Sequence, residues 1–288
     1  MSGFEKAANL LPGGIRRSAL ELLDGYKETA EEIRLRIGEK PTILIGEKEM
    51  DIPKTEPITR QDLQRVLELT TGASPYASAE AIRKGYAAAP GGVRVGVCGR
   101  YRNGSGGMWA MDGVTSVDIR IPREVIGCAA DLCSTPFIST LIVSPPGGGK
   151  TTLLRDMVRI LSDSGYRISL CDERNEVSAC SESGFGFCIG RHTDVLVDMP
   201  KSQAAIQMIR TMNPQILAMD EISEEEDLDV CRSSRRCGVL LLATAHGRSR
   251  EDIFSRSVFA EPSRSSVFSR LIFISRRSGK RIYREEAV

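Results

Sequence analysis

The segment from Ser144 to Thr151 constrains the fold of this chain more than any other; it reads Ser-Pro-Pro-Gly-Gly-Gly-Lys-Thr. Three consecutive glycines let successive backbone N–H groups turn inward with no Cβ in the way. Residues 141–143 are apolar and predict a strand, whereas residues 150–162 have the apolar periodicity of a helix. A strand, a glycine-rich turn and a helix N-terminus form a phosphate-binding loop, so the sequence predicts an α/β sheet that binds a nucleotide.

Each part of this loop has an expected role in binding a triphosphate. Lys150 is long enough to reach the β and γ phosphates, and the Thr151 hydroxyl is a ligand for Mg²⁺. The expected nucleotide contacts are Pro146, Gly147, Gly148, Gly149, Lys150, Thr151 and Thr152. The pattern G-x-x-x-x-G-K-[ST] is met except at its first position, where Ser144 replaces glycine. This replacement leaves the loop geometry in question but removes no phosphate donor; an ordinary glycine-rich turn is the alternative interpretation.

Two acidic residues, Asp220 and Glu221, directly follow the apolar run 216–219. The run predicts a buried strand, and ligands of open α/β sheets bind at the carboxyl ends of strands. We expect Asp220 to hold the magnesium shell and Glu221 to orient and deprotonate an attacking water. Such an acid pair alone is weak evidence, because solvated strand ends often carry acids. The preceding phosphate loop makes the catalytic interpretation the stronger one.

Further polar residues follow other predicted strands. Thr244 or His246, after the strand 239–243, would sense the γ-phosphate, and His246 is an expected catalytic residue. Residues 172–174, Asp-Glu-Arg, follow another strand and are expected at the nucleotide site or at a boundary between subunits. Arg210 is an expected catalytic residue and one of four candidate arginine fingers that would complete the site of a neighbouring subunit. The other candidate arginines are Arg191, Arg248 and Arg250 as fingers and Arg120 and Arg123 as nucleotide contacts, each with a purely structural role as the alternative.

The sequence predicts two domains, with residues 1–130 forming an α+β domain and residues 131–288 forming the nucleotide-binding domain. Expected elements of the first are strands at 33–37, 42–45, 93–97 and 117–121 and helices at 61–70, capped by Thr59, and 78–88. Those of the second, beyond the loop, are strands at 168–171, 216–219, 239–243 and 271–274 and helices at 200–212 and 224–237. Apolar strands that alternate with helices indicate a buried, mainly parallel sheet.

Composition narrows the functional classes. The net charge of this 288-residue chain is +1, and aromatic residues make up 5%, so no basic lane with stacking aromatics favours nucleic acid as a partner. The eight cysteines form no C-x-x-C pair and indicate reduced thiols in a cytosolic protein. No apolar run approaches the roughly 20 residues needed to span a bilayer, so we expect membrane contact only through partners. Residues 248–288 carry ten Lys/Arg and five Asp/Glu, and no role is assigned to this basic stretch.

Several segments together carry a family resemblance. They are residues 31–36, 90–96, 119–121, 145–156, 172–174, 193–196, 209–214 and 242–247. The chain resembles the stage III sporulation protein AA family, ATPases of endospore-forming bacteria, over residues 31 to 250. That family is similar to the ring ATPases of type II and type IV secretion and of type IV pili. Ser144 and the segment 180–185 depart from or lie outside the shared pattern, and no role is transferred to the latter.

The resemblance implies a RecA-like P-loop NTPase core of the additional-strand class, with a smaller N-terminal α+β domain. It also implies ATP and Mg²⁺ as ligands and a homo-hexamer with nucleotide at subunit boundaries. The implied role is to energise a channel complex between mother cell and forespore, from the mother-cell cytoplasm, with membrane-embedded sporulation channel proteins as partners. A nucleotide-dependent assembly scaffold with slow turnover and a RecA-like nucleic-acid translocase are the alternatives.

Overall fold

The structure of the protein is a computed structural model. It describes residues 1–103, 109–133, 135–181, 184–255, 267–277 and 280–288. The chain divides into two units, Met1–Glu124 and Val125–Val288, each with its own hydrophobic core. Residues 125–130, placed in the first domain from the sequence, belong by their contacts to the second unit. Parts of the basic C-terminal stretch, at 256–266 and 278–279, and the centre of the segment 180–185 lie outside the described residues.

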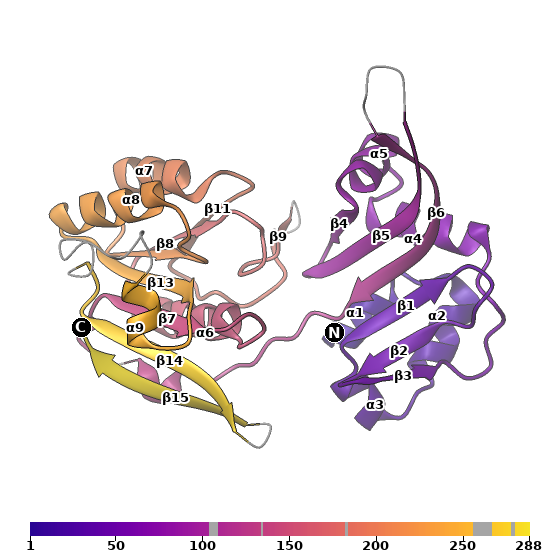
Figure 1. The fold of residues 1–288 in the computed structure, drawn as a ribbon, viewed down its shortest axis with the longest axis horizontal. Coiled ribbons are helices and arrows are strands. Elements are labelled where there is room, and N and C mark those ends of the chain that lie inside the picture. Colours follow the sequence, from indigo (N-terminus) through magenta and orange to yellow (C-terminus); the bar gives the residue numbers. More distant parts are fainter. Residues whose placement is uncertain (104–108, 134, 182–183, 256–266, 278–279) are drawn as a thin grey trace. The chain divides into compact units, whose positions relative to one another are not determined.

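The first unit is built on an antiparallel sheet of six strands (Figure 1). Their spatial order is β3 (Lys48–Asp51), β2 (Thr42–Ile45), β1 (Glu32–Arg36), β6 (Trp109–Arg120), β5 (Val93–Asn103) and β4 (Tyr86–Ala89). The helices are α1 (Gly3–Ala8), α2 (Gly13–Leu20), α3 (Asp24–Thr29), α4 (Arg60–Thr70) and α5 (Pro75–Lys84). Alternate residues of β1, Ile33 and Leu35, are fully buried, which confirms the predicted half-buried strand.

The local sequence correctly predicts where α4 begins but not where α5 ends. Thr59 caps α4 as expected, because its hydroxyl accepts the N–H of Asp62 at 3.2 Å. The predicted helix 78–88 is wrong at its end. Gly85, with φ +74°, follows α5, and the next residues pair with β5 as the strand β4. Pairing across the sheet, rather than helix propensity, therefore determines the structure of residues 86–89.

The second unit contains a sheet of seven strands. Their order is β11 (Thr193–Val197), β8 (Ile168–Asp172), β12 (Ile216–Met219), β13 (Leu240–His246), β7 (Thr140–Ser144), β14 (Arg270–Arg277) and β15 (Lys280–Ala287). Only the β14–β15 pair in this sheet is antiparallel. Strand β13 lies between β7, which enters the glycine-rich loop, and β12, which ends at the acid pair. This additional strand confirms the predicted RecA-like class of the core.

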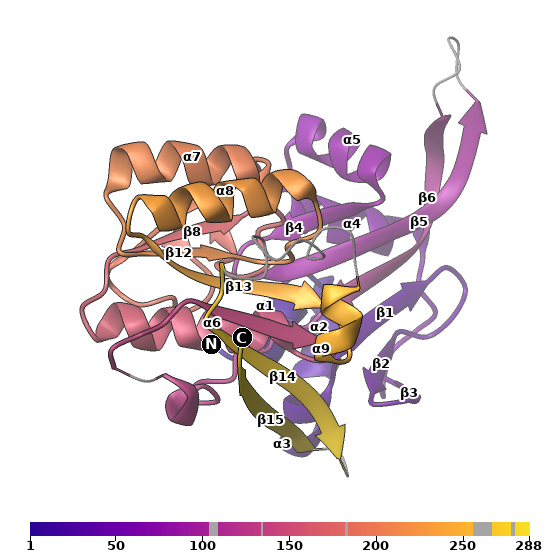
Figure 2. The same ribbon diagram turned by 60° about the vertical axis from the view of Figure 1, so that its left-hand side comes forward.

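Helices cover both faces of this sheet (Figures 1 and 2). Helix α6 (Lys150–Asp163) packs on one face through the leucines, methionine and valine of its apolar side, together with the short helix η1 (Ala130–Leu132). Helices α7 (Lys201–Met212), α8 (Glu225–Arg236) and α9 (Arg250–Phe254) contribute to the core on the other face. Helix α9, the short pair β9 (Cys180–Ser181) and β10 (Gly184–Phe185), and the C-terminal strand β15 are among the elements not expected from the sequence.

Candidate functional site

The glycine-rich loop joins the buried end of β7 to the start of α6. Gly147 and Gly149 have φ angles of +70° and +98°, which L side chains rarely adopt, so the loop needs glycine at both positions. Gly148 is needed for space, because a Cβ there would lie 2.3 Å from Ser144 Oγ and 3.0 Å from the Pro145 carbonyl oxygen. Gly147 and Gly149 are thus needed for their backbone conformation, and Gly148 is needed because a side chain would not fit.

Ser144, the one departure from the loop pattern, fits its position. It is the last residue of β7, in extended backbone, and its carbonyl accepts the N–H of Gly247 at 3.1 Å. Its side chain is buried and donates to the Pro145 carbonyl at 2.9 Å. The backbone at this position does not require glycine, and the hydroxyl is satisfied within the loop.

The loop and the acid pair meet at the carboxyl edge of the sheet. Thr151 Oγ1 lies 2.8 Å from Asp220 Oδ2, to which it donates a hydrogen bond. The other oxygen, Asp220 Oδ1, accepts from the hydroxyl of Thr244 at 2.5 Å. A hydroxyl and a carboxylate next to a phosphate loop are the protein ligands that Mg²⁺ uses in nucleotide sites, where phosphates and waters complete an octahedral shell. These two residues therefore fit a nucleotide-bound Mg²⁺.

Glu221 is held in an unusual conformation. Its φ is +56°, a left-handed value that costs energy in a residue with a Cβ. Its N–H donates to Thr244 Oγ1 at 2.8 Å, and the next N–H, of Ile222, donates to the Thr244 carbonyl at 2.7 Å. Its carboxylate lies 2.9 Å from the Arg174 guanidinium and 3.6 Å from His246 Nε2. Strand β13 therefore aims the Glu221 carboxylate across the sheet edge.

Lys150 lies beside His246. The Lys150 side chain is 7% exposed, and its Nζ is 3.0 Å from His246 Nδ1. An ammonium only donates, so Nδ1 accepts and the ring proton is on Nε2, toward Glu221. Burial lowers the pKa of Lys150 below its ordinary value, although the charges of Asp220 and Glu221 oppose this shift. A buried cation at the N-terminus of a helix is in the setting that an anionic ligand stabilises.

The three residues that follow β8 have separate roles. Asp172 is buried and turns into its own loop, where it accepts the backbone N–H groups of residues 176–178 and the Ser178 hydroxyl. Burial raises the pKa of Asp172, while the bonds from Ser178 act against the rise. Glu173 pairs with Lys201 at 3.2 Å. Of the three, Arg174 is the one that contacts the acid pair, through Glu221.

A sequence profile of the family described as "Sporulation stage III, protein AA" matches residues 2–284. The chain belongs to this family. Stage III sporulation protein AA of Bacillus subtilis (strain 168) is 32% identical to it over 286 residues, which are 96% of this chain and 92% of that protein. Uncharacterized protein ycf45 of Cyanidium caldarium is 30% identical over 149 residues, 49% of this chain and 43% of that protein. The family resemblance drawn from the sequence is confirmed.

Solved structures show the same fold. The pilus retraction motor PilT with bound ADP has a TM-score of 0.69 at 16% identity, covering 93% of this chain and 82% of that one. The ATPase DotB of Legionella pneumophila has a TM-score of 0.57 at 14% identity, covering 89% of this chain and 76% of its own. This sporulation protein AA family member thus has the RecA-like P-loop fold of secretion ATPases. In its described residues, no helix combines the length and apolar character needed to cross a bilayer.

The structure places the candidate arginines differently. Arg210 is exposed in the last turn of α7, whose end leads into the opposite end of β12, so its own subunit does not bring it to Lys150. Arg120 and Arg123 are engaged within the first unit. Arg120 lies 3.9 Å from Glu32, and Arg123 donates to the Thr29 and Ala30 carbonyls. Arg250 donates to the Ala287 carbonyl at 2.6 Å, while Arg191 and Arg248 are exposed.

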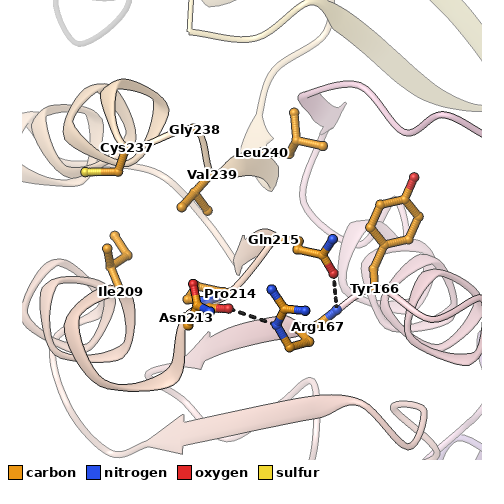
Figure 3. Close-up of a pocket in the computed structure, with 10 residues that line it drawn as sticks. All are labelled: Tyr166, Arg167, Ile209, Asn213, Pro214, Gln215, Cys237, Gly238, Val239 and Leu240. Carbon is orange, nitrogen blue, oxygen red and sulfur yellow. Dashed lines mark hydrogen bonds between the residues drawn. The ribbon is translucent and has the colours of Figure 1, made fainter.

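A separate cavity of about 560 Å³ lies at the opposite edge of the same sheet (Figure 3). Its lining comes from residues at the amino ends of β8, β12 and β13, including Arg167, Gln215 and Leu240. Arg167 is already bonded, since its Nε donates to the Asn213 carbonyl at 3.1 Å and its N–H to Gln215 Oε1 at 3.1 Å. This cavity holds none of the residues expected to bind nucleotide.

Proposed function

We propose that this chain binds ATP with Mg²⁺ and hydrolyses it. The observation that carries the proposal is the convergence of Lys150, Thr151 and the acid pair at one sheet edge, with Thr244 bonded to both acids. These residues come from helix α6, the end of strand β12 and strand β13, which are far apart in the sequence. A glycine-rich turn without nucleotide chemistry would not require Asp220 to bond both Thr151 and Thr244. The ATP-hydrolysing interpretation accounts for all of these contacts.

The roles follow from the geometry of the site. Residues 146–152 would cradle the phosphates, and Lys150 would neutralise their charge. Thr151 and Asp220 would hold Mg²⁺, which offsets phosphate charge as the bond breaks. Glu221 would accept a proton from the attacking water and orient it. His246, between Lys150 and Glu221, would respond to the presence of the γ-phosphate.

The biological proposal is a homo-hexameric ring that energises a channel complex between mother cell and forespore. Family membership and the fold shared with PilT and DotB support it. In this proposal the ring works in the mother-cell cytoplasm and reaches the membrane through channel proteins. The two units, 1–124 and 125–288, would be a partner-contacting domain and an ATPase domain. Arg210, exposed and remote from the site of its own subunit, would act on a neighbouring subunit.

Glu221→Gln tests the hydrolytic proposal. The amide keeps the side-chain shape but cannot take a proton, so ATP binding should persist while phosphate release falls by about 10²-fold or more. Lys150→Ala should abolish both ATP binding and phosphate release, because the buried cation that would contact the phosphates is removed. The matched control is Glu226→Gln, an exposed acid in the first turn of α8. Normal hydrolysis by Glu221→Gln, with Glu226→Gln also normal, would remove Glu221 from the role of base.

A scaffold that assembles with nucleotide and turns over slowly is the second candidate. The 2.9 Å ion pair between Glu221 and Arg174 favours it, because the carboxylate that would orient the attacking water is engaged by a guanidinium. The Arg174 side chain is 65% exposed, so solvent weakens the pair and a neighbouring subunit would have access to it. A wild-type turnover number far below about 1 s⁻¹ would support the scaffold, whereas one above it would support the ring motor.

A further inference from the structure

The C-terminal hairpin reaches the glycine-rich loop. A Cβ added to Gly149 would lie 2.6 Å from Arg281 Nε, 2.7 Å from Cζ and 2.8 Å from Nη2. The Arg281 guanidinium, from strand β15, therefore lies directly over the residue that precedes Lys150. Gly149 is the N-cap of α6 and has no side chain to cap the helix. An arginine side chain thus lies at the N-terminal end of α6.

The hairpin is held in this place by the sheet. Strand β14 pairs in parallel with β7 up to the match of Phe273 with Val143, and it continues past that pairing to Arg277. Strand β15 returns antiparallel to it, which sets Arg281 opposite Arg276. Backbone pairing, rather than a flexible tail, therefore delivers Arg281 to the loop.

The electrostatic setting of Arg281 is unfavourable without an anion. The N-terminus of a helix carries partial positive charge, and Lys150 adds a full one beside it. Arg281 Nε is buried and has no hydrogen-bond partner within the described part of the chain. A buried guanidinium nitrogen without a partner costs free energy that a charged acceptor would recover.

The neighbours of Arg281 do not supply that acceptor. Burial raises the pKa of the Cys128 thiol to about 11, and burial also raises the pKa of Tyr283, so both side chains are neutral at pH 7. Asp156, the acid that acts on both of these groups, is bonded to the Arg159 guanidinium at 2.7 Å and to the N–H of Ala129 at 2.8 Å. Among these described neighbours, no acid is left without a partner, so an anionic ligand would complete the surroundings of Arg281.

We propose that Arg281 binds the phosphates of the nucleotide from the same subunit, as a second cation opposite Lys150. This inference rests on the proposed binding of ATP and assigns a ligand contact to the basic C-terminal stretch. Arginine suits the task because its planar guanidinium donates two parallel hydrogen bonds to phosphate oxygens.

Three variants of the full chain test this contact. Arg281→Met removes the charge and keeps an unbranched side chain, Arg281→Lys keeps the charge without the planar fork, and Arg277→Met is the control on an exposed arginine of the same hairpin. Affinity for Mg-ATP should fall about tenfold or more in Arg281→Met, equivalent to about 1.4 kcal/mol. It should fall less in Arg281→Lys and stay at the wild-type value in Arg277→Met.

Two further readouts separate phosphate binding from other roles. Inorganic tripolyphosphate with Mg²⁺, competing against a fluorescent ATP analogue, should lose affinity by the same factor as ATP; an unchanged competition constant would contradict a phosphate contact. Without nucleotide, Arg281→Met should melt at the wild-type temperature or above, because it removes an unpaired cation from a helix N-terminus. A lower melting temperature would make Arg281 a structural residue and overturn the inference.

The results also distinguish this inference from the function on which it rests. If the wild type binds ATP, Lys150→Ala does not, and Arg281→Met binds like the wild type, only the Arg281 contact is wrong. If the wild type does not bind ATP, the proposed function is wrong and the Arg281 contact is overturned with it.

Discussion

At the scale of single residues, Thr244 organises the candidate site. Its hydroxyl accepts the N–H of Glu221 and donates to Asp220, so one oxygen joins both acids. Its side chain is fully buried, whereas His246 is one-third exposed between Lys150 and Glu221. We therefore propose that Thr244 positions the acids and that His246 contacts the γ-phosphate. The sequence left open whether Thr244 or His246 would sense the γ-phosphate, and in this proposal the two residues have different roles.

Thr244→Val keeps the shape of the side chain and removes its hydroxyl. The N–H of Glu221 and one oxygen of Asp220 would lose their partner, so we expect the turnover number to fall by about tenfold to a hundredfold, in line with one or two lost hydrogen bonds. Nucleotide affinity should change less, because Lys150 and the loop are untouched. Thr244→Ser, which restores the hydroxyl, should recover most of the rate, and failure of this rescue would contradict the positioning role.

At the scale of elements, α6 does more than begin at the phosphate loop. Its buried side includes an acid, Asp156, which is 2% exposed and accepts the N–H of Ala129 at 2.8 Å. Burial by itself would raise the pKa of Asp156, but the N–H of Ala129, the Arg159 guanidinium and the N–H of Gly127 together lower it below its ordinary value. Helix α6 thus anchors the segment that begins the second unit.

The charge of Asp156 should make its contribution to the free energy of unfolding depend on pH. A carboxyl with a lowered folded-state pKa stabilises the fold above its unfolded value of about 3.9, and this stability is lost as pH falls through the folded pKa. Asp156→Asn should lower the free energy of unfolding by about 1–3 kcal/mol at pH 7, with a smaller difference below pH ~3.9. Urea titrations at both pH values measure this, with the part-exposed Asp163→Asn as a control expected near zero. If Asp156→Asn lowered the free energy of unfolding equally at both pH values, the charge of Asp156 would not be the cause of the loss.

At the scale of the whole molecule, two units with separate cores divide the chain. The first is an antiparallel sheet with its own helices, and the second carries every residue of the candidate ATP site. Lys150 and Arg281 are the cations that we propose its own subunit contributes, whereas Arg210 lies in the last turn of α7. An arginine finger must therefore come from another copy of the chain if Arg210 has that role.

This arrangement predicts that ATPase activity depends on assembly. The rate per subunit should rise with protein concentration and level off as rings complete, because a shared site gains its finger only at a subunit boundary. Phosphate release measured over a dilution series, alongside light scattering, follows both quantities. A rate per subunit that stays constant while assembly proceeds would contradict shared sites. Stimulation by DNA or RNA that weakens with salt would instead support a nucleic-acid translocase.

The sequence alone predicted the features that depend on neighbours along the chain. The phosphate loop, the acid pair after β12 and the Thr59 cap are local patterns, in which spacing of a few residues determines the structure. The additional strand β13 was expected through the family resemblance, and the order of the strands confirms it. The end of α5 was wrong because β5 offers residues 86–89 a pairing partner that the local sequence does not reveal.

Only the tertiary structure decided which distant side chains meet. It turned Asp172 into its own loop, directed Arg174 to Glu221, and gave Thr244 the position between the two acids. Most of all, it brought Arg281 from an unassigned basic stretch onto Gly149. An arginine in a C-terminal strand has no local signal for such a contact, because the register of β14 on β7 determines where the hairpin points. The local sequence of residues 144–151 was thus enough to predict a nucleotide site. The pairing of strands in the sheet determines which distant side chains surround that site.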